Sequence, residues 1–103
     1  MPRFAANLTF LFTEIPFMER FAAARRAGLD AVEFMFPYDY KLEDIKARLR
    51  ETGLQLVLCN LPAGNWAGGD RGTAGNPERR EEFRKGVARG IDAARTLGVG
   101  RLN

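Results

Sequence analysis

Residues 51–58, ETGLQLVL, contain the pattern that decides the fold, because a helix end, a glycine and an apolar strand follow one another directly. The same order occurs in residues 26–33, RAGLDAVE, and in residues 96–103, TLGVGRLN. Strands that are apolar along their whole length and alternate with helices are typical of a parallel sheet with right-handed crossovers. The sequence therefore predicts an α/β fold made of parallel βα units.

The other elements can be placed outward from this repeat. We expect strands over residues 4–8, 31–34 and 55–60, and the start of a fourth strand over residues 99–103. Pro16 and the pair Asn76-Pro77 mark the starts of the first and third helices, because asparagine caps a helix and proline fits its first turn. Three glycines are expected to close the three helices in the left-handed conformation: Gly28, Gly53 and Gly98.

Helical spacing of apolar residues predicts which faces of these helices are buried. The stripe of the second helix consists of Leu42, Ile45 and Leu49. The stripe of the third helix consists of Phe83, Val87, Ile91, Ala94 and Leu97. Gly86 and Gly90 lie on the same third helix, where we expect them to allow close packing.

Composition restricts the class of protein. The 103 residues, of which 46% are hydrophobic and 28% charged, are typical of one soluble globular domain. No apolar run reaches the roughly 18 residues of a membrane span, and a signal peptide is not recognisable, so we expect a cytoplasmic protein without a membrane partner. The net charge of +3 does not predict nucleic-acid binding, because basic and acidic residues alternate in stretches such as ERREE, residues 78–82.

The supply of reactive side chains is narrow. Histidine is absent and Cys59 is the only cysteine, which excludes Ser–His–Asp and Cys–His catalysis, histidine-ligated zinc and an intrachain disulfide. Cys59 lies inside an apolar strand, which favours a small buried hydrophobe over a reactive thiol. A metal bound by this chain would need carboxylate or amide oxygens, which favours magnesium, manganese or calcium.

A long loop, residues 61–76, separates the third strand from the third helix. Loops of this length inside a compact domain are usually functional or disordered. This one carries Trp66 and two adjacent charged residues, Asp70 and Arg71. Two interpretations of Arg71 stay open: an exposed ion pair with Asp70, or a guanidinium that binds a substrate carboxylate. Trp66 either covers the strand ends or anchors an interface. The loop glycines match no nucleotide-binding motif.

Each expected strand finishes with a polar side chain. Because side chains alternate along a strand, counting from the closing glycines gives Glu33, Asn60 and Asn103 the same parity. Asn7 lies near the carboxyl end of the first strand in the same sense. In parallel α/β folds, ligands bind beyond the carboxyl ends of the strands. The alternatives are a turn role for the asparagines and solvent exposure for Glu33.

Three segments closely resemble the hydroxypyruvate isomerase family of xylose-isomerase-like TIM barrels: residues 4–8, FAANL, residues 28–39, GLDAVEFMFPYD, and residues 60–72, NLPAGNWAGGDRG. The resemblance implies a (β/α)8 barrel of which residues 1–103 form the N-terminal part, its first three and a half units. It also implies interconversion of hydroxypyruvate and tartronate semialdehyde by proton transfer through an enediolate. A divalent metal, Mg or Mn, is implied as well, with its ligands and the catalytic acids beyond Asn103.

On this resemblance, the chain is expected to contribute substrate contacts and no catalytic or metal-binding residue. The expected substrate-binding residues are Asn7, Glu33, Asn60, Trp66 and Arg71. The expected partners are a small 2-oxo acid or sugar-like substrate and other copies of the chain in a homo-oligomer. A second hypothesis is a catalytically silent α/β fragment that self-associates by burying its open sheet edges and inward apolar residues such as Leu56 and Leu58. An endonuclease-like function is disfavoured by the lack of histidine.

Overall fold

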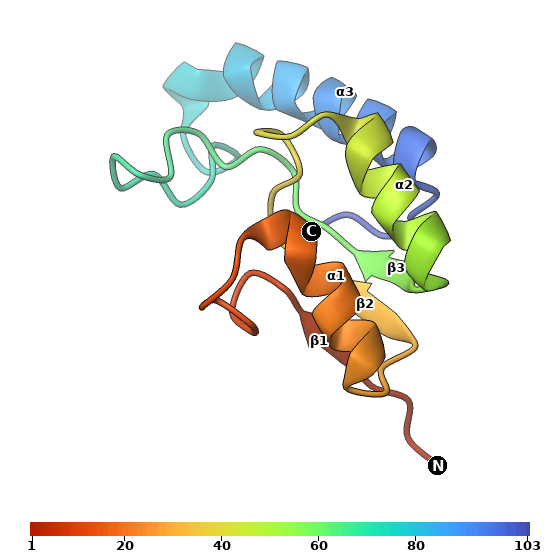
Figure 1. Ribbon diagram of the computed structural model, residues 1–103. Coiled ribbons are helices and arrows are strands. Elements are labelled where there is room, and N and C mark those ends of the chain that lie inside the picture. Colours follow the sequence, from red (N-terminus) through yellow and green to blue (C-terminus); the bar gives the residue numbers. More distant parts are fainter.

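The computed structural model describes all 103 residues, and its strands and helices alternate along the chain (Figure 1). The strands are β1 (Ala5–Asn7), β2 (Ala31–Glu33) and β3 (Gln55–Leu58). The helices are α1 (Phe17–Arg26), α2 (Leu42–Thr52) and α3 (Arg80–Leu97), the last preceded by a 3-10 turn, η1 (Pro77–Arg79). The predicted α/β alternation is confirmed.

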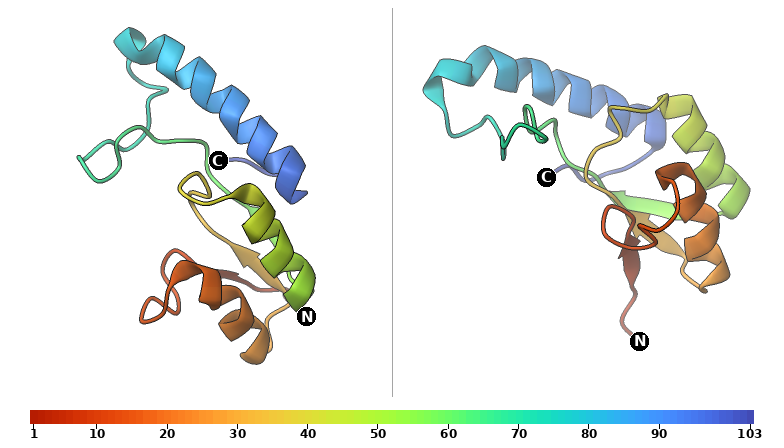
Figure 2. Two further views of the ribbon diagram at one scale, coloured as in Figure 1. Left: turned by 45° about the horizontal axis from the view of Figure 1, so that its top comes forward. Right: turned by 60° about the vertical axis from the view of Figure 1, so that its left-hand side comes forward.

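The three strands form one parallel sheet in the order β1-β2-β3. Asn7 is paired with Glu33, so the carboxyl ends of β1 and β2 lie at the same edge. After α3 the chain returns beside β3, where Leu102 bridges Cys59 in parallel and the amide of Leu61 donates to the carbonyl of Asn103 at 2.8 Å. In Figure 2 this returning segment lies next to β3, while the N-terminal residues extend away from the sheet. The predicted fourth strand is therefore present as its first pairings.

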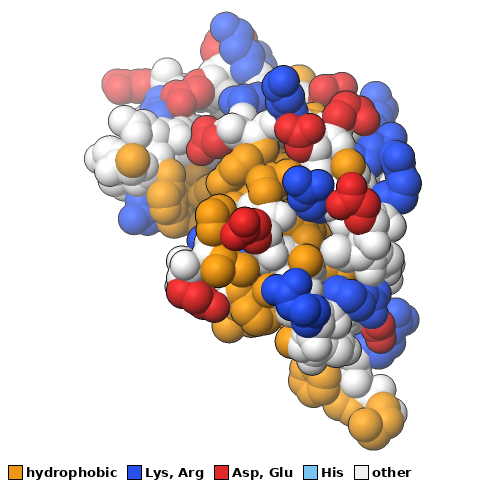
Figure 3. Space-filling model, in the orientation of Figure 1, with side chains coloured by type: hydrophobic (Ala, Val, Ile, Leu, Met, Phe, Trp, Pro, Cys, Tyr) orange, Lys and Arg blue, Asp and Glu red, His pale blue; other side chains and the backbone are white.

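The outer faces of α2 and α3 carry charges of both signs. Figure 3 shows basic and acidic side chains intermixed at the top and right of the molecule, with no separate basic face in this view. Ion pairs join residues three apart, Arg48 with Glu51 at 3.2 Å and Arg84 with Glu81 at 2.8 Å. The stretch 78–82 thus belongs to a solvated helix start, as its charge pattern predicts. No helix is both long and apolar enough to cross a membrane.

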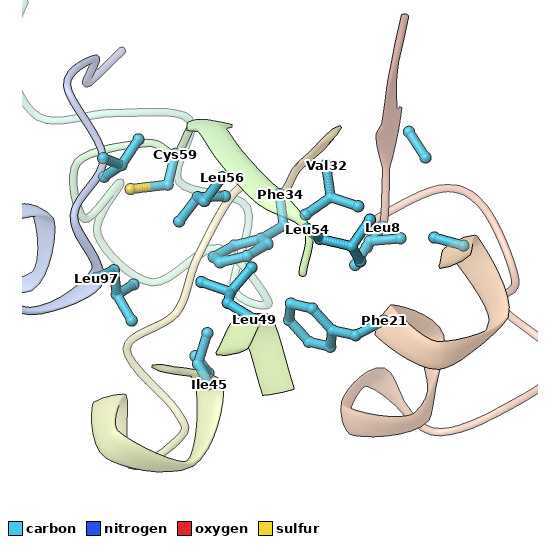
Figure 4. Packing of buried hydrophobic residues seen from close by; sticks show 13 residues of the cluster. Leu8, Phe21, Val32, Phe34, Ile45, Leu49, Leu54, Leu56, Cys59 and Leu97 are labelled. Atoms are coloured by element: carbon cyan, nitrogen blue, oxygen red, sulfur yellow. The ribbon is translucent and has the colours of Figure 1, made fainter. Parts of the chain in front are cut away.

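The core lies between the sheet and the three helices (Figure 4). Its largest fully buried side chains come from loop, strand and helix alike: Leu8, Phe21, Val32, Phe34, Ile45 and Cys59. The rings of Phe21 and Phe34 meet edge to face with their centroids 6.0 Å apart. Ile45 and Leu49 of α2 are buried, and Leu42 packs against the same cluster, which confirms the predicted stripe.

The predicted stripe of α3 is partly wrong. Ile91 is 40% exposed, whereas Gly90, Ala93 and Leu97 are buried. The buried face of α3 is therefore the face with the smallest side chains. A Cβ on Gly90 would lie 2.4 Å from Cδ2 of Leu61, so the glycine allows the loop after β3 to run directly across the helix. Counting large apolar residues misplaces a helix face that is built for close approach.

The inward position predicted for Leu56 is also wrong. Leu56 is 5% exposed and belongs to the core beside the helices, as Figure 4 shows. Val32 pairs with Leu56 but Glu33 pairs with Leu58, so the register shifts there and β3 has one additional residue, Val57. Such a bulge reverses the alternation of side chains. Buried Cys59 follows on the helix side, which returns Asn60 to the face predicted for it.

The predicted helix boundaries are confirmed within a turn. Gly53 and Gly98 have φ angles of 66° and 72° and end α2 and α3 in the left-handed conformation. The side chain of Asn76 accepts from the amide of Glu78 at 3.0 Å, and Pro77 follows as expected, although the first turn is a 3-10 helix. These boundaries place the loops after β1, β2 and β3 together at the carboxyl edge of the sheet.

Candidate functional site

The carboxyl ends of β1 and β2 hold a polar pair. Nδ2 of Asn7 donates to Oε1 of Glu33 at 3.2 Å, and Oδ1 of Asn7 accepts from the backbone amide of Thr9 at 2.9 Å. The second bond fixes which way the amide group faces, so only its NH2 can point to the carboxylate. Oε2 of Glu33 has no hydrogen-bond partner within the chain. This oxygen remains free to accept a hydrogen bond from a ligand.

The carboxyl end of β3 meets the returning chain through a second pair. Nδ2 of Asn103 lies 3.5 Å from Oδ1 of Asn60. The hydroxyl of Tyr38, in the loop after β2, donates to the backbone carbonyl of Asn60. The four predicted strand-end residues therefore form two neighbouring pairs on adjacent strands, Asn7 with Glu33 and Asn60 with Asn103.

The loop after β3 closes on itself between residues 63 and 72. The amide of Gly72 donates to the carbonyl of Ala63 at 3.0 Å. Inside the loop, Oδ2 of Asp70 accepts from the amide of Asn65 at 2.7 Å. Gly64, at φ 83°, lies directly under this contact, since a Cβ there would be 2.4 Å from Oδ2 of Asp70. The loop is thus an ordered, compact unit and not a linker.

Arg71 stacks on the aromatic ring of the same loop. Its Cζ lies 3.9 Å from the centre of the Trp66 ring, a cation–π contact. Nη1 donates to the carbonyls of Trp66 at 3.1 Å and Asp70 at 2.7 Å. Nε and Nη2 make no hydrogen bond, and Arg71 forms no ion pair. One edge of a positioned guanidinium is therefore free for an anion.

The predicted alternative of an Asp70–Arg71 ion pair is wrong, because Asp70 pairs with Arg79 instead, with Nη2 2.8 Å from Oδ2. The hydrogen bonds from the Arg79 side chain and from the Asn65 amide lower the pKa of Asp70 to about 2. No sequence signal singles out Arg79, since it lies in the charged stretch 78–82, which has the charge pattern of a solvated helix start. Only the folded loop shows that its partner lies nine residues upstream.

Three of the five expected substrate-binding residues line one cavity: Asn60, Trp66 and Arg71. A cavity of about 460 Å³ lies at the carboxyl end of β3, and its lining includes Asn60, Trp66, Arg71 and Asn103. Trp66 is 39% exposed and packs against Phe36, with ring centroids 5.1 Å apart, so it forms a wall of the cavity. Asn7 and Glu33 do not line this cavity; they lie further along the same sheet edge. The candidate site therefore consists of an anion-binding part and a carboxylate part.

Burial near the site favours the neutral forms of a phenol and a thiol, those of Tyr38 and Cys59. Burial raises the pKa of Tyr38 to about 12, and burial raises the pKa of Cys59 to about 11. Cys59 is fully buried, which confirms the prediction of a structural thiol. Nowhere do three or more His, Cys, Asp or Glu side chains cluster closely enough to hold a metal ion. Glu33 alone does not fit a divalent metal, which needs several oxygen ligands.

Comparison with known proteins gives a consistent picture. Residues 21–103 match the family described as "Xylose isomerase-like TIM barrel". The chain is 52% identical over 103 residues to hydroxypyruvate isomerase of Escherichia coli (strain K12), and 44% identical over 103 residues to 2-oxo-tetronate isomerase of Cupriavidus necator. A crystal structure described as AP endonuclease, family 2, from Brucella melitensis superposes with a TM-score of 0.96 at 46% identity over 99% of this chain. The chain spans about 40% of the length of these relatives.

Proposed function

The chain belongs to the xylose isomerase-like TIM barrel family, and we propose that the protein containing it isomerises small hydroxylated 2-oxo acids, with hydroxypyruvate and tartronate semialdehyde as the pair of interest. The observation that carries this proposal is the free guanidinium edge of Arg71 beside a cavity at the strand ends. The isomerase activities after which the relatives at 52% and 44% identity are named support it.

Arg71 is proposed to bind the substrate carboxylate. Its Nε and Nη2 atoms present two parallel donors, the geometry that matches the two oxygens of a carboxylate. Stacking on Trp66 holds the guanidinium plane, so little rotational freedom is lost when the anion binds. Asn60, on the floor of the same cavity, is proposed to contact the substrate beside its carboxylate.

Glu33 and Asn7 are proposed to bind the hydroxyl end of the substrate. A hydroxyl group can donate to the free Oε2 of Glu33, while Asn7 holds Oε1 and keeps the carboxylate in place. A 2-oxo acid without the hydroxyl would leave that oxygen unpaired. This arrangement would favour hydroxylated substrates.

Isomerisation also needs a base that removes a proton beside the carbonyl and an acid that returns it at the neighbouring carbon. We propose that these groups, and the ligands of a Mg or Mn ion, come from parts of the protein outside this chain. Among the 103 residues, no three His, Cys, Asp or Glu side chains cluster closely enough to hold a metal ion. The 103 residues alone are expected to be inactive on hydroxypyruvate.

Turnover of hydroxypyruvate by the intact protein tests the proposal. A hydrogen bond to a charged group contributes about 1.5–3 kcal/mol, and Arg71→Ala removes two of them, so kcat/KM should fall by roughly 10- to 150-fold or more. Arg71→Lys keeps the charge but loses the two-donor edge, and should recover only part of the loss. Arg48→Ala, which removes a surface arginine on α2, serves as the matched control and should leave the kinetics unchanged. Unchanged kinetics in Arg71→Ala would remove Arg71 from the site.

A second candidate is a catalytically silent α/β unit that self-associates. It is supported by exposed aromatic side chains near the N-terminus, with Phe4 71% and Phe10 66% exposed. It is also supported by the unpaired outer edge of β1. A homo-oligomeric, cytoplasmic enzyme remains our first proposal, and the single buried thiol of Cys59 suits a reducing compartment.

A further inference from the structure

We propose that Arg79 is a positioning residue for substrate binding, which acts through Asp70 to hold the Trp66–Arg71 pair at the cavity. This inference rests on the proposed function for its kinetic consequence, but its structural part stands on contacts within the chain. Arg79 does not line the 460 Å³ cavity, so its effect on a ligand is indirect.

Arg79 is held by Glu82, in the first turn of α3. Its Nε lies 2.7 Å from Oε2 of Glu82 and its Nη2 lies 2.8 Å from Oε1, so the pairing is bidentate. A bidentate pair restricts the orientation of the guanidinium plane. The side chain is 29% exposed, less than those of the other arginines in ion pairs, which range from 37% to 66%. The helix therefore presents Arg79 in one direction.

The same guanidinium reaches the loop. Nη2 of Arg79 donates to Oδ2 of Asp70 at 2.8 Å, across nine residues of sequence. Asp70 then connects to the site through its backbone, because its carbonyl accepts from Nη1 of Arg71 at 2.7 Å. The chain of contacts runs from the α3 side of the molecule through Arg79 and Asp70 to the guanidinium proposed to bind substrate.

The backbone of Gly64 packs closely against this ion pair. A Cβ on Gly64 would lie 2.4 Å from Oδ2 of Asp70 and 2.8 Å from Nη2 of Arg79. The ion pair therefore rests directly on the glycine backbone. The φ of 83° at Gly64 is one that other residues rarely adopt, so both conformation and space require glycine here.

The guanidinium of Arg79 favours the ionised form of both carboxylates that it binds. The hydrogen bond from Arg79 lowers the pKa of Asp70 to about 2, and it also lowers the pKa of Glu82. Both carboxylates are therefore ionised wherever the protein works. The arrangement is a permanent clamp under these conditions and not a switch.

Without Arg79, the Asp70 side chain loses its ion pair, and part of the loop must be ordered when the substrate binds. Fixing the backbone of about one residue corresponds to roughly a tenfold loss of affinity. We expect Arg79→Ala in the intact protein to raise KM for hydroxypyruvate about tenfold and to leave kcat within about threefold, because the chemical groups are untouched. Arg79→Lys can reach one carboxylate but not fork between two, so it should recover part of the KM.

Fluorescence of Trp66 supplies a second measurement, which reports on the loop itself and not on the overall stability of the protein. It is the only tryptophan among the 103 residues, and Arg71 lies against its ring. Acrylamide quenching of Trp66, taken as the difference from a Trp66→Phe protein, reports how firmly the loop covers the ring. We expect the quenching constant to rise about twofold in Arg79→Ala and in Asp70→Asn, while the melting temperature changes by only a few degrees.

Arg84→Ala is the matched control, since Arg84 is also on α3, forms an ion pair with Glu81 at 2.8 Å and makes no hydrogen bond or ion pair with the loop. It should leave KM and quenching at wild-type values. Wild-type KM and quenching in a folded Arg79→Ala protein would overturn the inference. If the wild-type protein does not turn over hydroxypyruvate, the proposed function falls, whereas the quenching comparison still decides whether Arg79 positions the loop.

Discussion

Asn7 donates a hydrogen bond from Nδ2 to Oε1 of Glu33 at 3.2 Å, across two neighbouring parallel strands. The amide of Thr9 holds the other side of Asn7, and Thr9 also accepts from the amide of Met35 through its hydroxyl at 2.9 Å. The ends of β1 and β2 are therefore tied by side chains as well as by the strand pairing. Glu33 is presented with one oxygen bound and the other free.

Glu33→Gln in the intact protein should weaken the use of hydroxylated substrates selectively. A hydrogen bond to a charged group contributes about 1.5–3 kcal/mol, which corresponds to roughly a 10- to 150-fold fall in kcat/KM for hydroxypyruvate. The inhibition constant of pyruvate, which has no hydroxyl to donate, should stay within about twofold. Steady-state kinetics with pyruvate as the competing ligand measures both quantities.

Glu81→Gln is the control for this substitution, because Glu81 is an exposed carboxylate on α3 that pairs only with Arg84. It should change neither value. Equal weakening of hydroxypyruvate and pyruvate in Glu33→Gln would show that Glu33 does not distinguish the hydroxyl.

The course of the chain could be predicted from sequence because each unit repeats one local pattern. Gly53 and Gly98 end helices in the left-handed conformation, and an apolar strand follows each of them. Such signals are local, since they depend on backbone conformation and hydrophobic period. The bulge at Val57 depends on pairing with β2, and no local signal announces it. Leu56 was misplaced for that reason, while Asn60 kept its predicted face.

In the candidate site, too, some residues could be predicted from sequence and others could not. Arg71 and Trp66 could be chosen from sequence because a long glycine-rich loop that carries them is unusual. The partner of Asp70 could not, since Arg79 is one of several arginines in a charged stretch and its distance to Asp70 is set by the closure of the loop. Long-range ion pairs in loops are products of tertiary structure.

The two glycines of α3 should respond in opposite ways to alanine. At Gly86 a Cβ would meet Pro62 at 3.8 Å, an ordinary contact, so Gly86→Ala should gain up to about 1 kcal/mol of helix stability. At Gly90 a Cβ would lie 2.4 Å from Leu61, so the same gain is opposed by an overpacking cost of about 1–3 kcal/mol. Urea denaturation of the two variants should place Gly86→Ala above Gly90→Ala in midpoint.

The comparison isolates the contact with Leu61, because both substitutions add the same methyl group to the same helix. A Gly90→Ala, Leu61→Ala double variant should lose most of the difference. Equal midpoints for the two single variants would mean that the loop after β3 gives way without cost.

Stability should fall in alkali through Cys59 and Tyr38. The pKa of Cys59 is raised from 9.0 to about 11, so between these values the unfolded thiol loses its proton while the folded thiol keeps it. The folded state then binds more protons, and the free energy of unfolding decreases as the pH rises from 9 to 11. The pKa of Tyr38 is raised from 10.0 to about 12, so Tyr38 lowers the free energy of unfolding further between pH 10 and 12.

Denaturation curves at pH 8, 9, 10 and 11 measure this slope. Cys59→Ala should lower stability at every pH by leaving a cavity, but should flatten the slope between pH 9 and 11. Tyr38→Phe loses the bond to the carbonyl of Asn60 and should flatten the slope above pH 10. Parallel curves for wild type and both variants would assign the alkaline loss to other groups.

The 103 residues expressed alone should self-associate and be inactive on hydroxypyruvate. A hollow of about 560 Å³ lies against the inner face of the sheet, and its lining includes Ala5, Ala31, Gln55 and Val57 from the three strands and Arg101 from the returning segment. A barrel covers this face with its other strands, whereas here it is open and the outer edge of β1 is unpaired. Sedimentation at tens of micromolar should therefore show dimers or larger species.

Two substitutions by lysine distinguish association through this inner face from nonspecific hydrophobic association. Val57→Lys places a charge in the hollow and should shift the isolated chain toward monomer, because burying an unpaired ammonium against a second copy is costly. Ile91→Lys removes an equally apolar side chain that is 40% exposed on α3, and should leave the association unchanged. A compact wild-type monomer at these concentrations would argue that the open face is tolerated in water, and would remove the self-associating alternative while leaving the isomerase proposal intact.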